Sequence, residues 1–495
     1  MQPTSLDQID PRTPVIAGVG VASQHLDEPG AGIEALELMV AAAQAAGEDS
    51  GATGIMREVQ RIAVPGGTWK YSDPGRLIAE RIGAPGAFTS LVQPGIPQQT
   101  LLNQAHAAIR DGEIDVAVIV GGEAARRATL ARRAGIDVVD TVQDDAIPDD
   151  LQVPSGEILS RIEIEGGTAS AMAPFAIIDS ALRAHEGRTL DEQRDEIARL
   201  WAGFNRMAGE FPGAAFPEPL DAAFIREPSE KNRPYAFPYN KWHCAQMNVD
   251  QAAAILVCSL DAAARLGVAF EQVVFPLVAL ESSFMRTVST RRDMHRWPGM
   301  EVLGRAAEEH LGYPMREIEL AELYSCFPAA VRVQQRALGL PVDGVPTITG
   351  GEPFAGGPWN NFVLQVTAAM VDRVRAVPGQ PGMVTTVSGL LNKPGLAVYA
   401  TRPGPGPMLL GDLAEAAAVA TEGVEAVAGY RGPATVAAST VHYDGMDPAR
   451  CTVIADTPDG TRCVATSADA DVARRATLEE LIGTSIGVDG VSFRV

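Results

Sequence analysis

The strongest constraint on the fold is an order of apolar runs and amphipathic segments that occurs twice along the chain. The first half has predicted strands at 14–20, 61–67, 88–93 and 115–122, and predicted helices at 32–47 and 98–110. The second half has predicted strands at 273–283, 318–325, 383–389 and 395–402, and predicted helices at 299–312 and 360–377. Such alternation is typical of a mostly parallel sheet covered by helices. Its repetition indicates an internal duplication, so we expect two similar layered units.

Two regions depart from this pattern. Between the halves, 126–240 contains an acidic loop, further helical patterns and a Pro- and aromatic-rich passage, KNRPYAFPYNKWH. A long insertion on a rigid scaffold is usually functional. After a Pro/Gly linker at 403–411, the pattern changes to period-two strands with tight turns, which predicts a separate β-rich domain, a small barrel of the oligonucleotide/oligosaccharide-binding type. We also expect Gly47 to close the first helix.

Composition excludes several classes of function. With 46% hydrophobic and 21% charged residues the chain can bury a large core, and 495 residues suggest roughly two to four domains. A net charge of −22 argues against a nucleic-acid partner, because no excess of cations can replace the counterions of phosphates. No signal peptide and no apolar stretch of the roughly 20 residues needed to span a bilayer is present, which predicts a cytoplasmic protein.

The residues that most often carry catalysis form no familiar pattern. Five cysteines in a chain of this length are expected to be free thiols, and no His/Cys spacing predicts a metal site. His106 lies on the helix at 98–110, where a structural role is expected, whereas His243 could be structural or could reach a pocket. Neither a Ser-His-Asp pattern nor a phosphate-binding loop is found.

Four strings nevertheless resemble, in their order and spacing, the thiolase superfamily, which condenses or cleaves acyl-CoA thioesters. They are LLNQAHAAIRDGEIDVAVIVGGEA, NRPYAFPYNKWHCAQMNVDQAAAILV, AELYSCFPAAV and GGEPFAGGPWNNF. The resemblance covers about residues 13–402. It is nearest to the sterol-carrier-protein-type thiolases and the acetyl-CoA acetyltransferase-like branch, and the added β domain points to thiolase-like proteins of type 1.

The resemblance implies an α/β thiolase fold of two stacked βαβαβαββ halves in αβαβα layers, with an inserted loop domain and a C-terminal β domain that resembles an oligonucleotide-binding barrel. The implied divisions are a tail at 1–13, an N-terminal half at 14–125 and 241–272, the loop domain at 126–240, a C-terminal half at 273–402, the linker at 403–411 and the β domain at 412–495.

The family's catalytic positions are mostly replaced. Its nucleophilic cysteine falls on Gly95, the histidine of its Gly-His-Pro turn on Gly357, and the cysteine of its Cys-x-Gly turn on Val387. Glycine cannot be acylated, so the covalent route is lost at Gly95. Tyr324 and Cys326 stand where the sterol-carrier-type branch has a histidine and an acid/base cysteine. Cys326 is either a buried small hydrophobe or a functional group of the pocket.

Binding of coenzyme A is a separate matter from catalysis. The family positions that touch the pantetheine arm correspond to Met172, Gln246 and Met247, and Arg233 and Lys241 lie in the region of the phosphates. The resemblance therefore implies CoA or acyl-CoA as a ligand, with no covalently bound cofactor and no metal.

Three functions remain open at this point. The first is an acyltransferase-like protein that binds acyl-CoA but cannot run ordinary thiolysis or Claisen condensation. The second is a lyase that cleaves a β-hydroxyacyl-CoA by a retro-aldol reaction through Tyr324 and Cys326, which needs no acyl-enzyme. The third is a non-catalytic scaffold whose C-terminal domain contacts a partner protein. The type 1 resemblance favours a monomer.

Overall fold

Two sheets with matching strand orders form the body of the molecule. The computed structural model describes residues 9–144 and 146–495, so residues 1–8 of the predicted tail lie outside the described part. The first sheet contains, in spatial order, β1 (Pro14–Gln24), β8 (Asp250–Ser259), β4 (Val116–Ala124), β2 (Arg61–Pro65), β3 (Phe88–Val92) and β5 (Asp150–Gln152). The second contains β10 (Leu320–Glu322), β11 (Gly382–Ser388), β12 (Lys393–Ala400), β9 (Phe275–Glu281) and β13 (Leu409–Asp412).

Four strands of each sheet correspond in their order and direction. In the first sheet β1 and β4 are both antiparallel to β8, and β2 is parallel to β4. In the second, β9 and β11 are both antiparallel to β12, and β10 is parallel to β11. The same order and the same directions agree with the predicted duplication.

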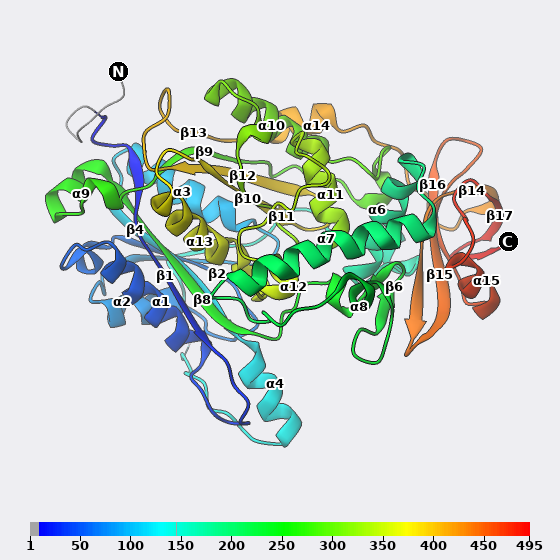
Figure 1. The fold of residues 1–495 in the computed structure, drawn as a ribbon, viewed down its shortest axis with the longest axis horizontal. Coiled ribbons are helices and arrows are strands. Elements are labelled where there is room, and N and C mark those ends of the chain that lie inside the picture. The colour runs from blue at the N-terminus through cyan, green and yellow to red at the C-terminus, as the bar shows by residue number, and fades with distance from the viewer. Residues whose placement is uncertain (1–8, 145) are drawn as a thin grey trace.

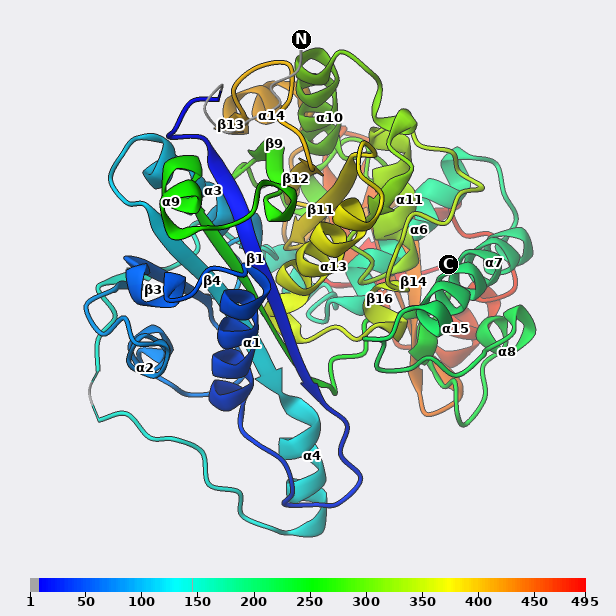
Figure 2. The ribbon, with the colours of Figure 1, turned by 60° about the vertical axis from the view of Figure 1, so that its left-hand side comes forward.

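Two helices, one from each half, lie between the sheets. They are α3 (Gln98–Arg110), which begins at the predicted residue, and α13 (Phe362–Ala376). One buried cluster joins Leu102 of α3 and Leu364 of α13 to Ile255 of β8 and Ala397 of β12. Figure 2 shows α13 between the strands of the two sheets. Most residues of both helices are buried, because a helix in a central layer has no face in water.

Outer helices complete the layers. The first sheet is covered by α1 (Ala35–Asp49) and α2 (Pro74–Ile82), and the second by α10 (Pro298–Leu311) and α11 (Pro328–Ala337). The prediction that Gly47 closes the first helix was wrong, because α1 continues to Asp49. A Cβ atom at Gly47 would lie 2.4 Å from Cγ of Met56, so glycine is needed here for close packing.

The insertion between the halves is mainly helical. It comprises α4 (Ala125–Ala134), α5 (Arg161–Glu165), α6 (Met172–His185), α7 (Leu190–Glu210), α8 (Ala222–Arg226), β6 (Pro234–Ala236) and β7 (Tyr239–Asn240). Shorter helices elsewhere are α9 (Leu260–Leu266), α12 (Gly351–Phe354), α14 (Ala414–Ala420) and α15 (Ala470–Ala476).

The C-terminal strands close into a five-stranded barrel. They are β14 (Arg431–Asp444), β15 (Asp447–Asp456), β16 (Arg462–Ser467), β18 (Ser492–Arg494) and β17 (Ser485–Asp489). They pair in this order, and β17 pairs back to β14, as the predicted oligonucleotide-binding type requires. The barrel lies at the far end of the molecule from α1 and α2 (Figure 1).

Three short strands connect regions that the sequence separates. At the end of the predicted linker, β13 adds to the second sheet by parallel pairing with β9. In the Pro- and aromatic-rich passage, β6 pairs with β14 of the barrel and β7 pairs with β6. Strands this short carry no period that a sequence pattern could reveal.

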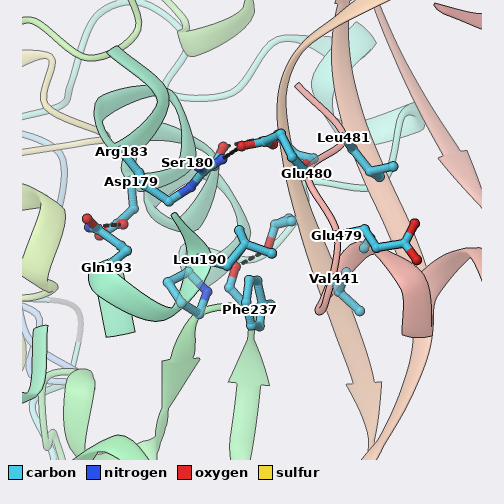
Figure 3. A pocket seen from close by; sticks show the side chains of 14 residues that line it. Asp179, Ser180, Arg183, Leu190, Gln193, Phe237, Val441, Glu479, Glu480 and Leu481 are labelled. Carbon is cyan, nitrogen blue, oxygen red and sulfur yellow. Dashed lines mark hydrogen bonds and ion pairs between the residues drawn. The ribbon is translucent and has the colours of Figure 1, made fainter. Parts of the chain in front are cut away.

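The barrel is fixed to α6 by polar contacts. Figure 3 shows Arg183 of α6 facing Glu480 of the C-terminal domain, with which it forms a salt bridge. The hydroxyl of Ser180 also accepts a 3.0 Å hydrogen bond from the backbone N–H of Ser439 on β14. Because Phe175 at the start of α6 belongs to the cavity described below, one rigid helix joins the barrel to that cavity.

Three further observations concern the described residues. All five cysteines are free. No three His, Cys, Asp or Glu side chains in residues 9–144 and 146–495 are grouped so that they could hold a metal ion. Over the same residues, no helix combines the length and the apolar character that a membrane crossing requires.

Candidate functional site

A cavity of about 880 Å³ opens where the two halves and the insertion meet. Its wall contains all eight positions that the resemblance assigns to catalysis or to the pantetheine arm: Gly95, Met172, Gln246, Met247, Tyr324, Cys326, Gly357 and Val387. These positions are spread over some 300 residues of sequence, so the fold, and not their proximity along the chain, brings them together. The volume is in the range of small-molecule and cofactor pockets.

The turn that precedes α3 forms one wall of the cavity. Gly95 has a φ of 107°, a conformation that favours glycine. A Cβ atom there would lie 3.1 Å and 3.2 Å from Cβ and Cγ of Pro154. The carbonyl oxygen of Gly95 accepts a 2.7 Å hydrogen bond from Nζ of Lys393 on β12. A hydrogen bond from the second half therefore fixes the nucleophile position, and Pro154 crowds the space that a side chain there would need.

The N-terminal end of α3 remains exposed to the cavity. Pro97 occupies the N-cap position and no side chain caps the helix, while Gln98 is part of the cavity wall. The first N–H groups of a helix have no partner within the helix and favour an anion or a carbonyl oxygen. The turn thus keeps a polar backbone feature although it lacks a nucleophile.

The two glycine-rich turns of the second half also lack reactive side chains. Gly357 donates its N–H to the carbonyl of Gln246 over 3.0 Å. A Cβ atom at Gly357 would lie 3.3 Å from Cβ of Glu352. Val387 is 6% exposed at the end of β11. Neither an imidazole nor a thiol is present at these positions, and the side chain of Glu352 lies beside the space that an imidazole at 357 would enter.

Tyr324 and Cys326 lie in the loop between β10 and α11. The backbone N–H of Tyr324 donates to Oγ1 of Thr385 over 2.9 Å, and its carbonyl accepts from Nε2 of Gln334 over 2.8 Å. The tyrosine ring packs edge-on against Phe362 at a centroid distance of 5.6 Å. Burial raises the pKa of the Cys326 thiol well above its usual range, and the nearby carboxyl of Glu352 raises it further. Cys326 is therefore a neutral thiol at pH 7, unlike an activated nucleophile.

Glu352 is a cavity residue that the sequence analysis missed. It lies in α12, is 3% exposed, and its Oε2 atom has no hydrogen-bond partner among the described residues. Burial raises the pKa of this carboxyl to about 8, against an opposing effect of its hydrogen bond with Tyr324. The signal available was an acidic residue between two glycine pairs, in a string that otherwise consists of apolar residues and turn formers.

The two histidines considered from sequence do not contribute to the cavity wall. His106 is fully buried in α3, and burial lowers its pKa to about 4, so its ring is neutral. His243 is 2% exposed and its Nδ1 atom accepts a 2.9 Å hydrogen bond from the backbone N–H of Asn240. Both imidazoles therefore have structural positions, and the idea that His243 reaches the pocket was wrong.

A pair of cations lies beside the cavity. Arg233 lies over the ring of Tyr235, which belongs to the cavity wall, at 5.7 Å, and Nζ of Lys241 lies over Trp242 at 4.7 Å. Burial lowers the pKa of Lys241, and the positive charge of Arg233 lowers it further. Within the described chain, neither cation forms a salt bridge. Two neighbouring cations without a carboxylate form a site suited to an anion.

Comparison with known proteins gives matches at the level of structure. No protein-family model matches the chain, and no curated protein matches it in sequence. A monomeric SCP2-thiolase-like protein type 1 from Mycobacterium smegmatis superposes with a TM-score of 0.82 and 27% identity, covering 98% of this chain and 99% of that one.

More distant structures share the fold of the body. The Ltp2-ChsH2(DUF35) aldolase matches with a TM-score of 0.58 at 18% identity, over 80% of this chain and 99% of that one. The dimeric peroxisomal thiolase of Saccharomyces cerevisiae matches with 0.53 at 15% identity, over 80% and 100%. These two matches show a shared fold. The match with the Mycobacterium smegmatis protein over almost the whole chain, together with the duplicated sheets, places the chain in the thiolase superfamily.

Proposed function

We propose that the protein binds an acyl-CoA thioester in the cavity and does not transfer the acyl group through a covalent acyl-enzyme. The observation that carries this proposal is the pairing of an intact cavity with Gly95 at the nucleophile position. A thiolase-type acyl transfer requires a thiolate at that position and a base to activate it. Here the turn supplies neither, and the two thiols in the wall, Cys244 and Cys326, are neutral at pH 7 because burial raises the pKa of both.

The ligand's orientation follows from the chemistry of the wall. Met172, Gln246 and Met247 offer an apolar and amide surface for the pantetheine arm, as the family resemblance implies. Arg233 and Lys241 supply the charge for the phosphates, and Tyr235 and Trp242 supply aromatic faces beside them. The thioester then lies toward Gly95 and Tyr324, with its carbonyl oxygen near the N-terminal end of α3.

Calorimetric titration with CoA and with a series of acyl-CoA thioesters tests binding directly. Incubation with the same ligands, followed by mass spectrometry of products, tests turnover. The proposal expects saturable binding and no exchange of the acyl group between thiols. Acyl exchange would contradict it, as would the absence of binding.

A second candidate function is retro-aldol cleavage of a β-hydroxyacyl-CoA. The observation that favours it is the presence of Tyr324 and Glu352 together in the cavity wall, where a proton acceptor and donor are available without a nucleophile. Release of an aldehyde or ketone that is lost in Tyr324→Phe would support this function. Binding without any turnover would favour a non-catalytic role as a scaffold or an acyl-CoA-binding protein.

We further propose a cytoplasmic monomer. The Mycobacterium smegmatis relative, which matches almost the whole chain, is monomeric. Light scattering coupled to gel filtration tests this, and a dimer mass would contradict it. The barrel surface that faces away from α6 remains the proposed place for a partner protein.

A further inference from the structure

The hydrogen bonding and burial of Glu352 are those of a functional carboxyl group and not of a structural one. The buried Glu322 has both of its oxygens occupied, since they accept hydrogen bonds from Thr347, Ile348 and Thr349. In contrast, Oε2 of Glu352 has no partner among the described residues, although the side chain is 3% exposed and lines the cavity. A buried polar atom without a partner is costly, and a catalytic role is one of the recognised explanations for it.

The backbone holds Glu352 firmly against the loop of Tyr324 and Cys326. The N–H of Glu352 donates to Oγ of Ser325 over 3.0 Å, and its carbonyl accepts from the N–H of Gln246 over 3.2 Å. The preceding Gly351 has a φ of 68°, and a Cβ atom there would lie 2.4 Å from Oγ of Ser325. This close packing fixes the carboxyl relative to the tyrosine, as an acid–base pair requires.

We propose that Glu352 and Tyr324 form a proton-transfer pair that cleaves a β-hydroxyacyl thioester, with Tyr324 touching the substrate hydroxyl and Glu352 accepting the proton through Tyr324. This inference rests on the thioester binding proposed above. It also accounts for the position of Glu352, whose Cβ lies 3.3 Å from the Cβ that a side chain at Gly357 would add. The carboxyl thus stands beside the place of the family's missing imidazole.

The reaction balances without a further reactant. The β-hydroxyl proton passes to the Tyr324 oxygen as the phenolic proton passes to the Glu352 carboxylate. The Cβ–O bond becomes a carbonyl, the Cα–Cβ bond breaks, and its electron pair forms the thioester enolate. The N-terminal end of α3 offers N–H groups to the enolate oxygen. The pair then returns the proton to Cα, which leaves an aldehyde or ketone and a shortened acyl-CoA.

The charges around the pair set the direction of its pH dependence. Burial raises the pKa of Glu352 to about 8, and the neighbouring Glu322 raises it further, while the hydrogen bond with Tyr324 lowers it. Burial and Glu352 both raise the pKa of Tyr324 well above its usual range, and they do the same for Cys326, which also lies near Cys244. Glu352 must be ionised to accept a proton, so cleavage increases as the pH rises toward about 8 and then levels off.

The test measures cleavage of a β-hydroxyacyl-CoA panel by the full-length protein between pH 6 and 9, with binding of the same ligands measured in parallel. The expected result is release of an aldehyde or ketone, with an inflection near pH 8. Glu352→Gln and Tyr324→Phe are each expected to lower kcat/KM by about 10²–10⁴-fold, the usual contribution of a general base. Glu352→Asp, which keeps a carboxyl, is expected to retain the inflection at a reduced rate.

Glu123→Gln is the matched control, because it removes a carboxyl from the same cavity wall. Both oxygens of Glu123 are held by Thr68, at 2.7 Å and 2.5 Å, so this variant should keep the inflection near pH 8. Binding without cleavage overturns the inference alone, whereas the absence of binding overturns the proposed function together with it. An equal loss of rate at every pH in Glu352→Gln, with the inflection retained, would show a structural role and also overturn the inference.

Discussion

Lys393 of the second half donates a 2.7 Å hydrogen bond to the carbonyl oxygen of Gly95, the residue at the nucleophile position of the first half. The lysine is 4% exposed, and burial lowers its pKa. The contact spans the boundary between the two duplicated units. The turn is fixed by this hydrogen bond, and Gly95 has a left-handed conformation with Pro154 packed against it. The turn can therefore present backbone groups to the cavity but not a side chain at position 95.

Restoring the family's cysteine should therefore fail to restore acyl transfer. In Gly95→Cys, the φ of 107° and the 3.1 Å approach to Pro154 should cost about 1–3 kcal/mol of unfolding free energy. No base lies at position 357 to activate the thiol. Denaturant unfolding measures the cost, and mass spectrometry after incubation with acyl-CoA checks for acylation. Gly86→Ala is the control, since a Cβ atom there meets nothing within 4 Å.

The raised pKa of Glu352 predicts a pH-dependent gain of stability in Glu352→Gln. Between the ordinary pKa of 4.5 and the folded value of about 8, the unfolded chain loses a proton that the folded protein keeps. The wild-type protein therefore loses stability as the pH rises through this range. Glu352→Gln lacks this loss. Its gain in unfolding free energy over the wild-type protein should be absent below pH 4.5 and reach on the order of 1–4 kcal/mol above pH 8. Urea unfolding at several pH values measures it, and an advantage that shrinks as the pH rises would contradict the assigned shift.

The cations Arg233 and Lys241 should contribute only to binding of the nucleotide end of CoA. In Lys241→Met, the affinity for CoA should fall by about 1.5–3 kcal/mol, the usual contribution of a hydrogen bond to a charged group. Binding of a pantetheine thioester, which lacks the nucleotide phosphates, should be unchanged. Calorimetry with both ligands distinguishes the effects, and an equal loss for the two would place Lys241 elsewhere along the ligand.

Tyr239 connects the insertion to the cavity wall. Its hydroxyl donates to Asp179 over 2.7 Å and accepts from the N–H of Ala329 over 3.2 Å, and its ring stacks on Phe327 at 5.7 Å. Tyr239→Phe leaves two buried polar groups unpaired and should cost about 1–3 kcal/mol.

Thermal or denaturant unfolding measures the effect of Tyr239→Phe. Tyr430→Phe removes a hydroxyl bonded to the carbonyl of Pro433 in an exposed position, where water can replace it, and should cost little. A comparable loss in both variants would show that burial does not set the cost.

The sequence predicted those parts of the structure that carry a long periodic signal. The start of α3 at Gln98 and the buried strand β4 were recognisable, because the helical period and the apolar run extend over nine residues or more. The resemblance then placed Gly95, Tyr324 and Cys326 around one cavity. The two-residue β7 and the four-residue α12 have no such signal, and α12 carries Glu352.

The role of Glu352 could not be read from sequence for a physical reason. Its significance depends on a contact with Tyr324, 28 positions earlier in the chain, and on the burial of both groups. Neither quantity appears in a local pattern. The same holds for Gly47, where contact with Met56 and not helix termination explains the glycine.

Native mass spectrometry of the protein with an acyl-CoA, before and after denaturation of the same sample, tests the central claim most directly. The account predicts a complex that carries the mass of the whole acyl-CoA and that disappears on denaturation. A mass increase equal to the acyl group alone, retained by the denatured chain, would contradict it, because it would show that an acyl-enzyme forms without a nucleophile at Gly95.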